Sequence, residues 1–213
     1  MDGFRYVLNS SRPIASIRKT LAEIPVELNP VAIIGAMGTE IAIEGAPDLE
    51  WQARFEGWDR SIVDAAMERL GADPHADEVQ TPFKASYAVP EHLRGRARKA
   101  IESSGQPARI IASGMSDFDV LPPGAGKGAA TLRCVEVFKV TTDGLIVAGD
   151  SANDLDLFRV ARKGIVVGNA RDELRRQVSP PTAYHSSQDF AAGVIEGLEH
   201  WGITLAKNRT LEP

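Results

Sequence analysis

The segment from Leu145 to Asp154 restricts the possible fold more than any other part of the chain. Four apolar residues, Leu145 to Ala148, run directly into Gly149-Asp150-Ser151-Ala152-Asn153-Asp154, and a helix is predicted from 155 to 161. A short apolar run without polar alternation is typical of a strand in a parallel sheet that is covered on both faces. The segment therefore predicts an α/β fold in which polar groups collect at the carboxyl end of a buried strand.

The remaining pattern divides into a parallel-sheet core and an inserted module. The core is predicted from strands at 4–8, 31–34 and 165–167 and from helices at 13–21, 127–137 and 189–200, with Asp189 as the cap of the last one. Between them, strands at 41–44, 83–89, 109–113 and 118–121 alternate with helices at 51–70 and 92–103. We therefore predict a core of residues 1–40 and 115–213 and an antiparallel α/β module of residues 41–114.

The amino-acid composition limits the classes of partner and the compartment that we expect. The 213 residues include 24 Lys and Arg against 29 Asp and Glu, which gives a net charge of -5. This balance argues against nucleic acid as the main partner, because phosphate backbones need clustered cations. There is one cysteine, Cys134, and no apolar run of about 18 residues, so we expect a cytoplasmic protein with no membrane span. The oligomeric state stays open.

The acidic loop after the strand at 145–148 has two interpretations. Asp150 and Asp154 could bind one Mg²⁺, since hard cations take carboxylate oxygens and the residues Gly149 and Ser151 allow a tight turn. Alternatively, the same residues cap the N-terminus of the next helix, where Asp and Asn are common. The residues alone leave both open.

A second candidate, Lys127, begins a predicted helix after Pro122-Pro123-Gly124-Ala125-Gly126. A Walker loop is excluded, because Leu121 and Gly128 occupy positions that need Gly and Ser or Thr. A dinucleotide-binding turn at 124–129 is a weak alternative, because two prolines precede it where a strand should lie. A lysine at a helix start opposes the helix dipole, so either an anion is bound there or the side chain is simply solvated.

The third candidate is the polar run Asn9-Ser10-Ser11-Arg12, which follows the first predicted strand. A hydroxyl and backbone N–H groups at such a turn can hold a phosphate. From the residues alone, an ordinary turn and helix cap is the favoured alternative.

Taken in order, these three segments resemble motifs of the haloacid-dehalogenase-like phosphatases. Further segments point to the sucrose-phosphate and mannosylfructose-phosphate phosphatases among them: 38–41, 83–87, 116–122, 164–170 and 193–202. The resemblance implies a Rossmann-like parallel-sheet core with an inserted cap domain, and a magnesium-dependent phosphatase that acts on a sugar or disaccharide phosphate.

The same resemblance implies a role for each candidate residue. Asp150 and Asp154 would hold Mg²⁺, Lys127 and Ser10 would bind the transferring phosphate, Asn153 would steady the lysine, and Arg12 would match the family arginine. On the cap side of the site, Glu40 and Lys84 would bind sugar hydroxyls, with ordinary surface charge as the alternative.

One family motif does not occur in residues 1–213. The family nucleophile lies in an Asp-x-Asp-x-Thr motif at the end of the first core strand, and no such sequence is present. We therefore expect a core that lacks this strand, with two half-sheets and open edges. The chain as given should be inactive, and a non-catalytic sugar-phosphate-binding protein is the alternative.

Overall fold

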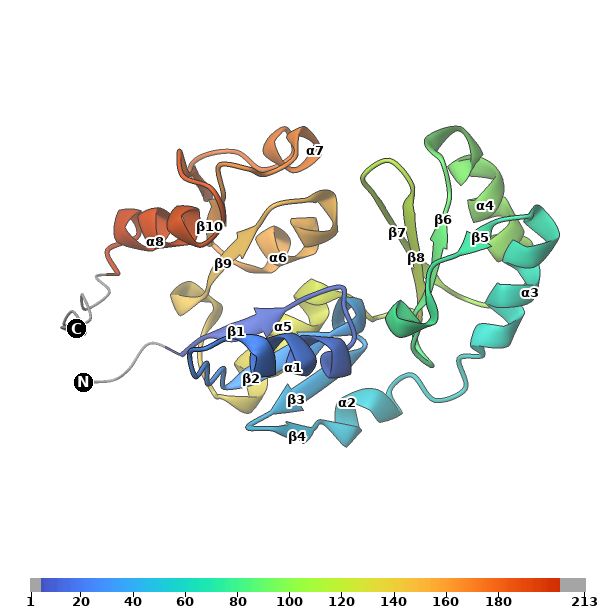
Figure 1. Cartoon of the computed structure of the whole chain (residues 1–213), viewed down its shortest axis with the longest axis horizontal. Helices are drawn as coiled ribbons and strands as arrows, with labels where there is room; N and C mark the ends of the chain where they lie inside the picture. The colour runs from blue at the N-terminus through green and yellow to red at the C-terminus, as the bar shows by residue number, and fades with distance from the viewer. Residues whose placement is uncertain (1–4, 204–213) are drawn as a thin grey trace. The chain divides into compact units, whose positions relative to one another are not determined.

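The computed structural model describes residues 5–203 and divides into two compact units, Met1–Val140 and Thr141–Pro213. The first unit contains two sheets with their helices, and the second contains one sheet (Figure 1). Each unit is described by itself below.

The first sheet of the first unit has the order β1-β2-β3-β4. β1 (Val7–Asn9) pairs in parallel with β2 (Ala32–Gly35), and β3 (Glu40–Ile43) and β4 (Ala46–Pro47) extend the sheet in antiparallel fashion. The strand predicted at 4–8 therefore begins at Val7, while Phe4 lies outside the described residues. β1 and β4 are the edge strands of this sheet.

Two helices cover opposite faces of β2. Ala32 and Ile34 share a buried cluster with Ala130 and Cys134 of α5 (Lys127–Val137), whose bounds match the predicted 127–137. Gly35 points the other way, and a side chain there would lie 2.7 Å from Ile14 of α1 (Ile14–Glu23). Alternate residues of a strand face opposite sides, so β2 is buried on both faces as its apolar sequence predicts.

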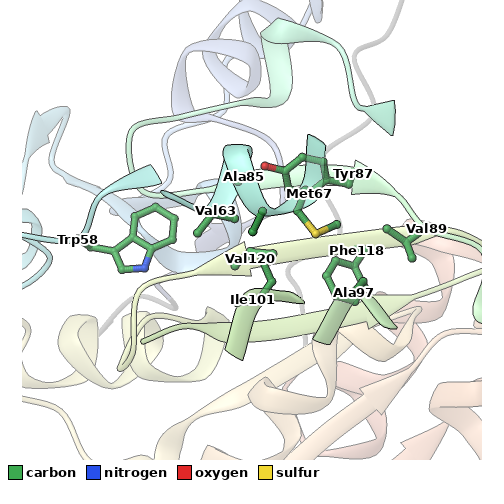
Figure 2. Close-up of a cluster of buried hydrophobic side chains, with 11 residues drawn as sticks. Trp58, Val63, Met67, Ala85, Tyr87, Val89, Ala97, Ile101, Phe118 and Val120 are labelled. Atoms are coloured by element: carbon green, nitrogen blue, oxygen red, sulfur yellow. The ribbon is translucent and has the colours of Figure 1, made fainter. Parts of the chain in front are cut away.

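The second sheet has the antiparallel order β5-β6-β8-β7 and confirms the predicted α/β module. Its strands are β5 (Asp73–Pro74), β6 (Ala85–Ala88), β7 (Arg109–Ser113) and β8 (Asp117–Leu121). One face is packed by α3 (Arg60–Leu70) and α4 (Glu91–Ser103), whose side chains enclose the cluster drawn in Figure 2. β8 continues this second sheet beyond residue 114, whereas β3 belongs to the first sheet. The predicted module boundaries at residues 41 and 114 stay predictions.

The single helix predicted at 51–70 is wrong. The structure has α2 (Leu49–Ala53) and α3, separated by a turn in which Gly57 has a φ of +85°. Asp59 starts the second helix by accepting the N–H of Ser61 at 2.9 Å. A left-handed residue and a new N-cap end one helix and begin another, and the residue pattern alone did not reveal them.

A short 3-10 helix, η2 (Asp77–Val79), precedes β6.

The second unit has one parallel sheet of order β11-β10-β9, formed by β9 (Ile146–Gly149), β10 (Lys163–Val166) and β11 (Ala183–His185). Its helices are η3 (Thr142–Gly144), η4 (Ala152–Asp154), α6 (Leu155–Val160), α7 (Asp172–Arg175) and α8 (Phe190–His200). Gly164 faces Phe158 of α6 and Ile165 faces Gly197 of α8, so the two helices cover opposite faces. β9 is an edge strand, and the parallel strands of residues 5–203 lie in two separate sheets, one in each unit.

Asp189 does not cap α8 as predicted. It occupies the N-cap position but makes no side-chain capping bond. The N–H of Phe190 is instead bound at 2.8 Å by the side-chain oxygen of Asn169, in the loop after β10. A neighbouring loop therefore supplies the cap.

Within residues 5–203, the longest apolar helices fall short of what a membrane crossing would require.

Cys134 should be unreactive in the folded protein. It is 3% exposed, and burial raises the pKa of its thiol from 9.0 to about 11. At pH 8 this shift leaves about 100-fold less thiolate than an unperturbed thiol would have, and the thiolate is the reactive form. Labelling with a chromogenic disulfide at pH 8 should be slow, and denaturant should make it complete within minutes. Rapid labelling without denaturant would contradict this packing of α5 on β2.

Candidate active site

The turn after β1 holds Ser10 and Arg12. The N–H of Ser10 donates to the carbonyl of Ile34 at 2.9 Å, and its hydroxyl accepts the N–H of Arg12 at 3.1 Å. The Arg12 guanidinium lies along α1, where it donates to the hydroxyls of Ser16 at 2.7 Å and Thr20 at 2.9 Å. The ordinary turn that the residues favoured is therefore present, and it places the Ser10 hydroxyl at the carboxyl end of β1.

Lys127 is the first residue of α5 and is only 4% exposed. Its carbonyl accepts the side-chain N–H of Asn9 at 3.2 Å and the hydroxyl of Thr131 at 2.8 Å. Asn9 also donates to the Thr131 hydroxyl at 3.1 Å, so the end of β1 is fastened to the first turn of α5. A desolvated ammonium at the positive end of a helix is unfavourable unless negative charge is placed beside it. The burial of Lys127 argues against a simply solvated lysine, and a helix N-terminus is a position at which anions bind.

A left-handed turn, η1 (Ala36–Gly38), follows β2. Its φ angles are +46°, +58° and +89°, and both Ala36 and Met37 are fully buried. Residues with a side chain cost about 1–2 kcal/mol in this region, so such a turn persists only where its surroundings fix it. The N–H groups of Ala36 and Met37 donate to the carbonyls of Arg12 at 2.7 Å and Ser10 at 3.2 Å. No signal in the sequence beyond Gly38 indicated this turn.

Glu40 has a structural partner. Its carboxylate accepts the N–H of Ile14 at 2.8 Å and thereby caps α1 from the neighbouring strand β3. Negative charge at a helix N-terminus is stabilising. The predicted contact of Glu40 with sugar hydroxyls stays a prediction, and this geometry gives the residue a different task.

Lys84, the other predicted sugar contact, is 3% exposed inside the module. Its ammonium meets the carbonyl of Val79 at 3.1 Å, the hydroxyl of Ser86 at 2.5 Å and the carboxylate of Asp119 at 3.2 Å. An ammonium has three N–H donors, so these partners satisfy all of them. The ion pair joins the segment before β6 to the middle of β8.

Replacement of Lys84 should therefore destabilise the module. Lys84→Met leaves the Asp119 carboxylate buried and without its cation, which should lower the free energy of unfolding by about 3–5 kcal/mol. Urea unfolding followed by circular dichroism measures the change, and Lys99→Met on the exposed side of α4 is the matched control. Unchanged stability, together with weaker substrate binding, would restore the predicted role of Lys84 at the sugar.

The acidic loop leaves β9 at its carboxyl end. Asp154 is 5% exposed, and one of its carboxylate oxygens accepts the N–H groups of Asp150 at 3.0 Å and Ser151 at 3.4 Å. Ser151 and Asp154 form a reciprocal capping box. Capping, one of the two alternatives drawn from the residues, is therefore observed for Asp154. The Asp150 side chain is exposed, and Asn153 lies between them in η4.

Gly149 makes this folded-back loop possible. A side chain at position 149 would lie 2.6 Å from Cβ of Asp154. Gly149→Ala should lower the free energy of unfolding by about 1–3 kcal/mol, because the loop must move away. Thermal unfolding measures the effect, with Gly144→Ala as the control, since nothing lies within 4 Å of a side chain there. Equal stability of the two variants would show that Asp154 is not held against Gly149.

The candidate residues thus form two groups, one in each unit. The phosphate half-site comprises Ser10, Arg12 and Lys127, and the acidic half-site comprises Asp150, Asn153 and Asp154. Across residues 5–203, no three His, Cys, Asp or Glu side chains are arranged to hold a metal ion. The dinucleotide-binding alternative fails, because residues 124–129 follow the antiparallel strand β8 rather than a strand of a parallel βαβ unit.

Comparison with known proteins identifies the family of this chain. Residues 2–202 match the family model described as sucrose-6F-phosphate phosphohydrolase. The mannosylfructose-phosphate phosphatase of Agrobacterium fabrum is 32% identical over 206 residues, which cover 92% of this chain and 83% of that protein. The chain belongs to the sucrose-6F-phosphate phosphohydrolase family. Membership makes it a phosphatase at the family level and confirms the resemblance seen in its motifs.

Solved structures and a plant relative agree with this assignment. The sucrose-phosphatase of Synechocystis sp. PCC6803, solved with sucrose and phosphate, has a TM-score of 0.85 at 27% identity, covering 93% of this chain and 85% of that one. A sugar phosphatase of haloacid-dehalogenase subclass IIB shares the fold, with a TM-score of 0.73 at 14% identity over 95% of this chain and 87% of that one. Sucrose-phosphatase 1 of Nicotiana tabacum is 30% identical over 92% of this chain, which spans half of that protein. The α/β haloacid-dehalogenase-like core with a cap domain is thus confirmed.

Proposed function

We propose that the protein acts as a magnesium-dependent phosphatase on a sugar or disaccharide phosphate of the sucrose-phosphate or mannosylfructose-phosphate type. The observation that carries this proposal is the buried position of Lys127 at the N-terminus of α5, beside the loop that carries Ser10. A helix N-terminus offers backbone N–H groups and positive charge to a phosphate dianion, and Lys127 adds its own positive charge there.

The chain's own groups would act on the phosphoryl oxygens. Lys127 would stabilise the charge that develops on the transferring group, and the Ser10 hydroxyl would donate a hydrogen bond to the same group. Arg12 donates to the hydroxyls of Ser16 and Thr20 and would have to leave them to contact the substrate, as the family resemblance implies for this arginine. Asn153 would steady the ammonium, as the family resemblance implies.

The acidic half-site fits one side of a magnesium site. The exposed Asp150 carboxylate at the end of β9 is the type of hard oxygen ligand that Mg²⁺ prefers, and Asp154 would complete the site directly or through water. When bound, the ion would neutralise the charge of the phosphate. Phosphate oxygens and waters would supply the other ligands, which agrees with the small number of carboxylates in this loop.

The reaction would pass through an aspartyl-phosphate, as the family resemblance implies. The required Asp-x-Asp-x-Thr does not occur in residues 1–213, so we expect this stretch alone to bind phosphate without turning it over. The same observation favours a second candidate, a non-catalytic protein that binds sugar phosphates.

Phosphate release from a panel of sugar and disaccharide phosphates distinguishes these candidates. We expect magnesium-dependent release from a form extended upstream of Met1 in the same reading frame, and none from residues 1–213. Chelation of Mg²⁺, Lys127→Met and Asp150→Asn should each reduce the release by about 100-fold or more. Lys19→Met, on the exposed side of α1, is the control and should not change it.

Two outcomes would decide against the enzyme, and a third would contradict the expected inactivity of residues 1–213. Absence of turnover by the extended form across the whole panel would reject it, and calorimetric binding without turnover would favour the second candidate. Robust turnover by residues 1–213, lost in Asp150→Asn, would refute the expectation that this stretch is inactive.

A further inference from the structure

The left-handed turn Ala36–Gly38 touches both parts of the phosphate half-site. On one side its first two N–H groups bind the carbonyls of Arg12 and Ser10. On the other side Gly38 lies against the start of α5, where a side chain on Gly38 would be 2.3 Å from the carbonyl oxygen of Gly126 and 2.9 Å from the nitrogen of Lys127. The turn is therefore in direct contact with the backbone on both sides of the half-site.

Only glycine satisfies this contact. Gly38 has a φ of +89° and Gly126 a φ of +144°, and the two backbones meet without an intervening side chain. A Cβ atom at Gly38 has no flexible neighbour to displace, because the atoms it would meet belong to the backbone. The spacing between the turn and the start of α5 is thus set by the absence of a side chain at position 38.

The turn is itself held rigidly. The Thr39 hydroxyl donates to the carbonyl of Ala36 at 2.9 Å, and the indole N–H of Trp51 donates to the carbonyl of Gly38 at 3.0 Å. Thr39, Ala36 and Met37 are fully buried, and Trp51 is 1% exposed. A conformation that is unfavourable for Ala and Met is therefore maintained by hydrogen bonds and packing on every side.

We propose that this turn is a positioning element which sets the separation between the Ser10 hydroxyl and the Lys127 ammonium, and that Gly38 is the residue on which its action depends. Neither Gly38 nor Thr39 needs to touch the phosphate. They act through the backbone of residues 10 and 126–127. The inference rests on the proposed function, since it assumes that Ser10 and Lys127 bind one phosphate.

Inorganic phosphate binding to residues 1–213, measured by calorimetry, tests the inference with two matched variants. Gly38→Ala and Gly45→Ala both place an alanine at a left-handed φ, +89° and +86°, but nothing lies within 4 Å of a side chain at position 45. The two variants thus share the backbone cost and differ in the contact with α5. We expect phosphate affinity to fall about tenfold or more in Gly38→Ala and to stay unchanged in Gly45→Ala.

A second pair of variants is the control for a folding defect in Gly38→Ala. Thr39→Val keeps the buried volume but removes the hydroxyl that closes the turn, and Thr39→Ser keeps the hydroxyl. We expect Thr39→Val to weaken phosphate binding and Thr39→Ser to retain it, with thermal unfolding recorded for each variant.

The outcomes separate the inference from the proposed function. Equal phosphate affinity of folded Gly38→Ala and Gly45→Ala, or of Thr39→Val and the unsubstituted chain, overturns the positioning role while the function stands. If the unsubstituted chain binds no phosphate, or Lys127→Met binds it equally well, the phosphate half-site itself is wrong and the inference fails with it.

Discussion

The placement of a lysine at the buried N-terminus of α5 is the constraint on which the phosphate half-site depends. The helix dipole and the loss of water both disfavour an ammonium there. The surrounding structure nevertheless fixes its backbone, through Asn9 and Thr131 on one side and the glycine contact of Gly38 with Gly126 on the other. Anions bind at helix N-termini, and a phosphoryl group is the anion that the family handles.

Much of the fold follows from local sequence. The bounds of α5 and β7 agree with those predicted, because each is a periodic segment between clear turn signals, and Val31 to Ile34 predicted a strand buried on both faces. The break between α2 and α3 was missed, since it depends on one left-handed glycine and a new cap. The turn at Ala36 and Met37 could not be predicted, because neither residue favours a positive φ and the hydrogen bonds that hold it come from distant segments.

Local sequence likewise predicts only part of the candidate site. Ser10 and Asp150 each follow a parallel strand at its carboxyl end, and Lys127 begins a helix after a loop with two prolines and two glycines. These local positions are visible in the sequence. The partners of Glu40 and Lys84 are not visible, since Ile14 and Asp119 lie far from them along the chain. In the structure Glu40 caps a helix and Lys84 forms a buried ion pair, and their predicted contacts with sugar hydroxyls stay predictions.

The central proposal is that phosphate, bound by Ser10 and Lys127, and Mg²⁺, bound by Asp150, take part in one reaction, as the family resemblance implies. If the binding of one ligand favours the binding of the other, each changes the affinity of the other by the same factor. Calorimetric titration of phosphate with and without Mg²⁺ measures this coupling. We predict that Mg²⁺ tightens phosphate binding and that Asp150→Asn abolishes the gain while leaving the magnesium-free affinity in place. Equal phosphate affinity with and without Mg²⁺ would contradict it.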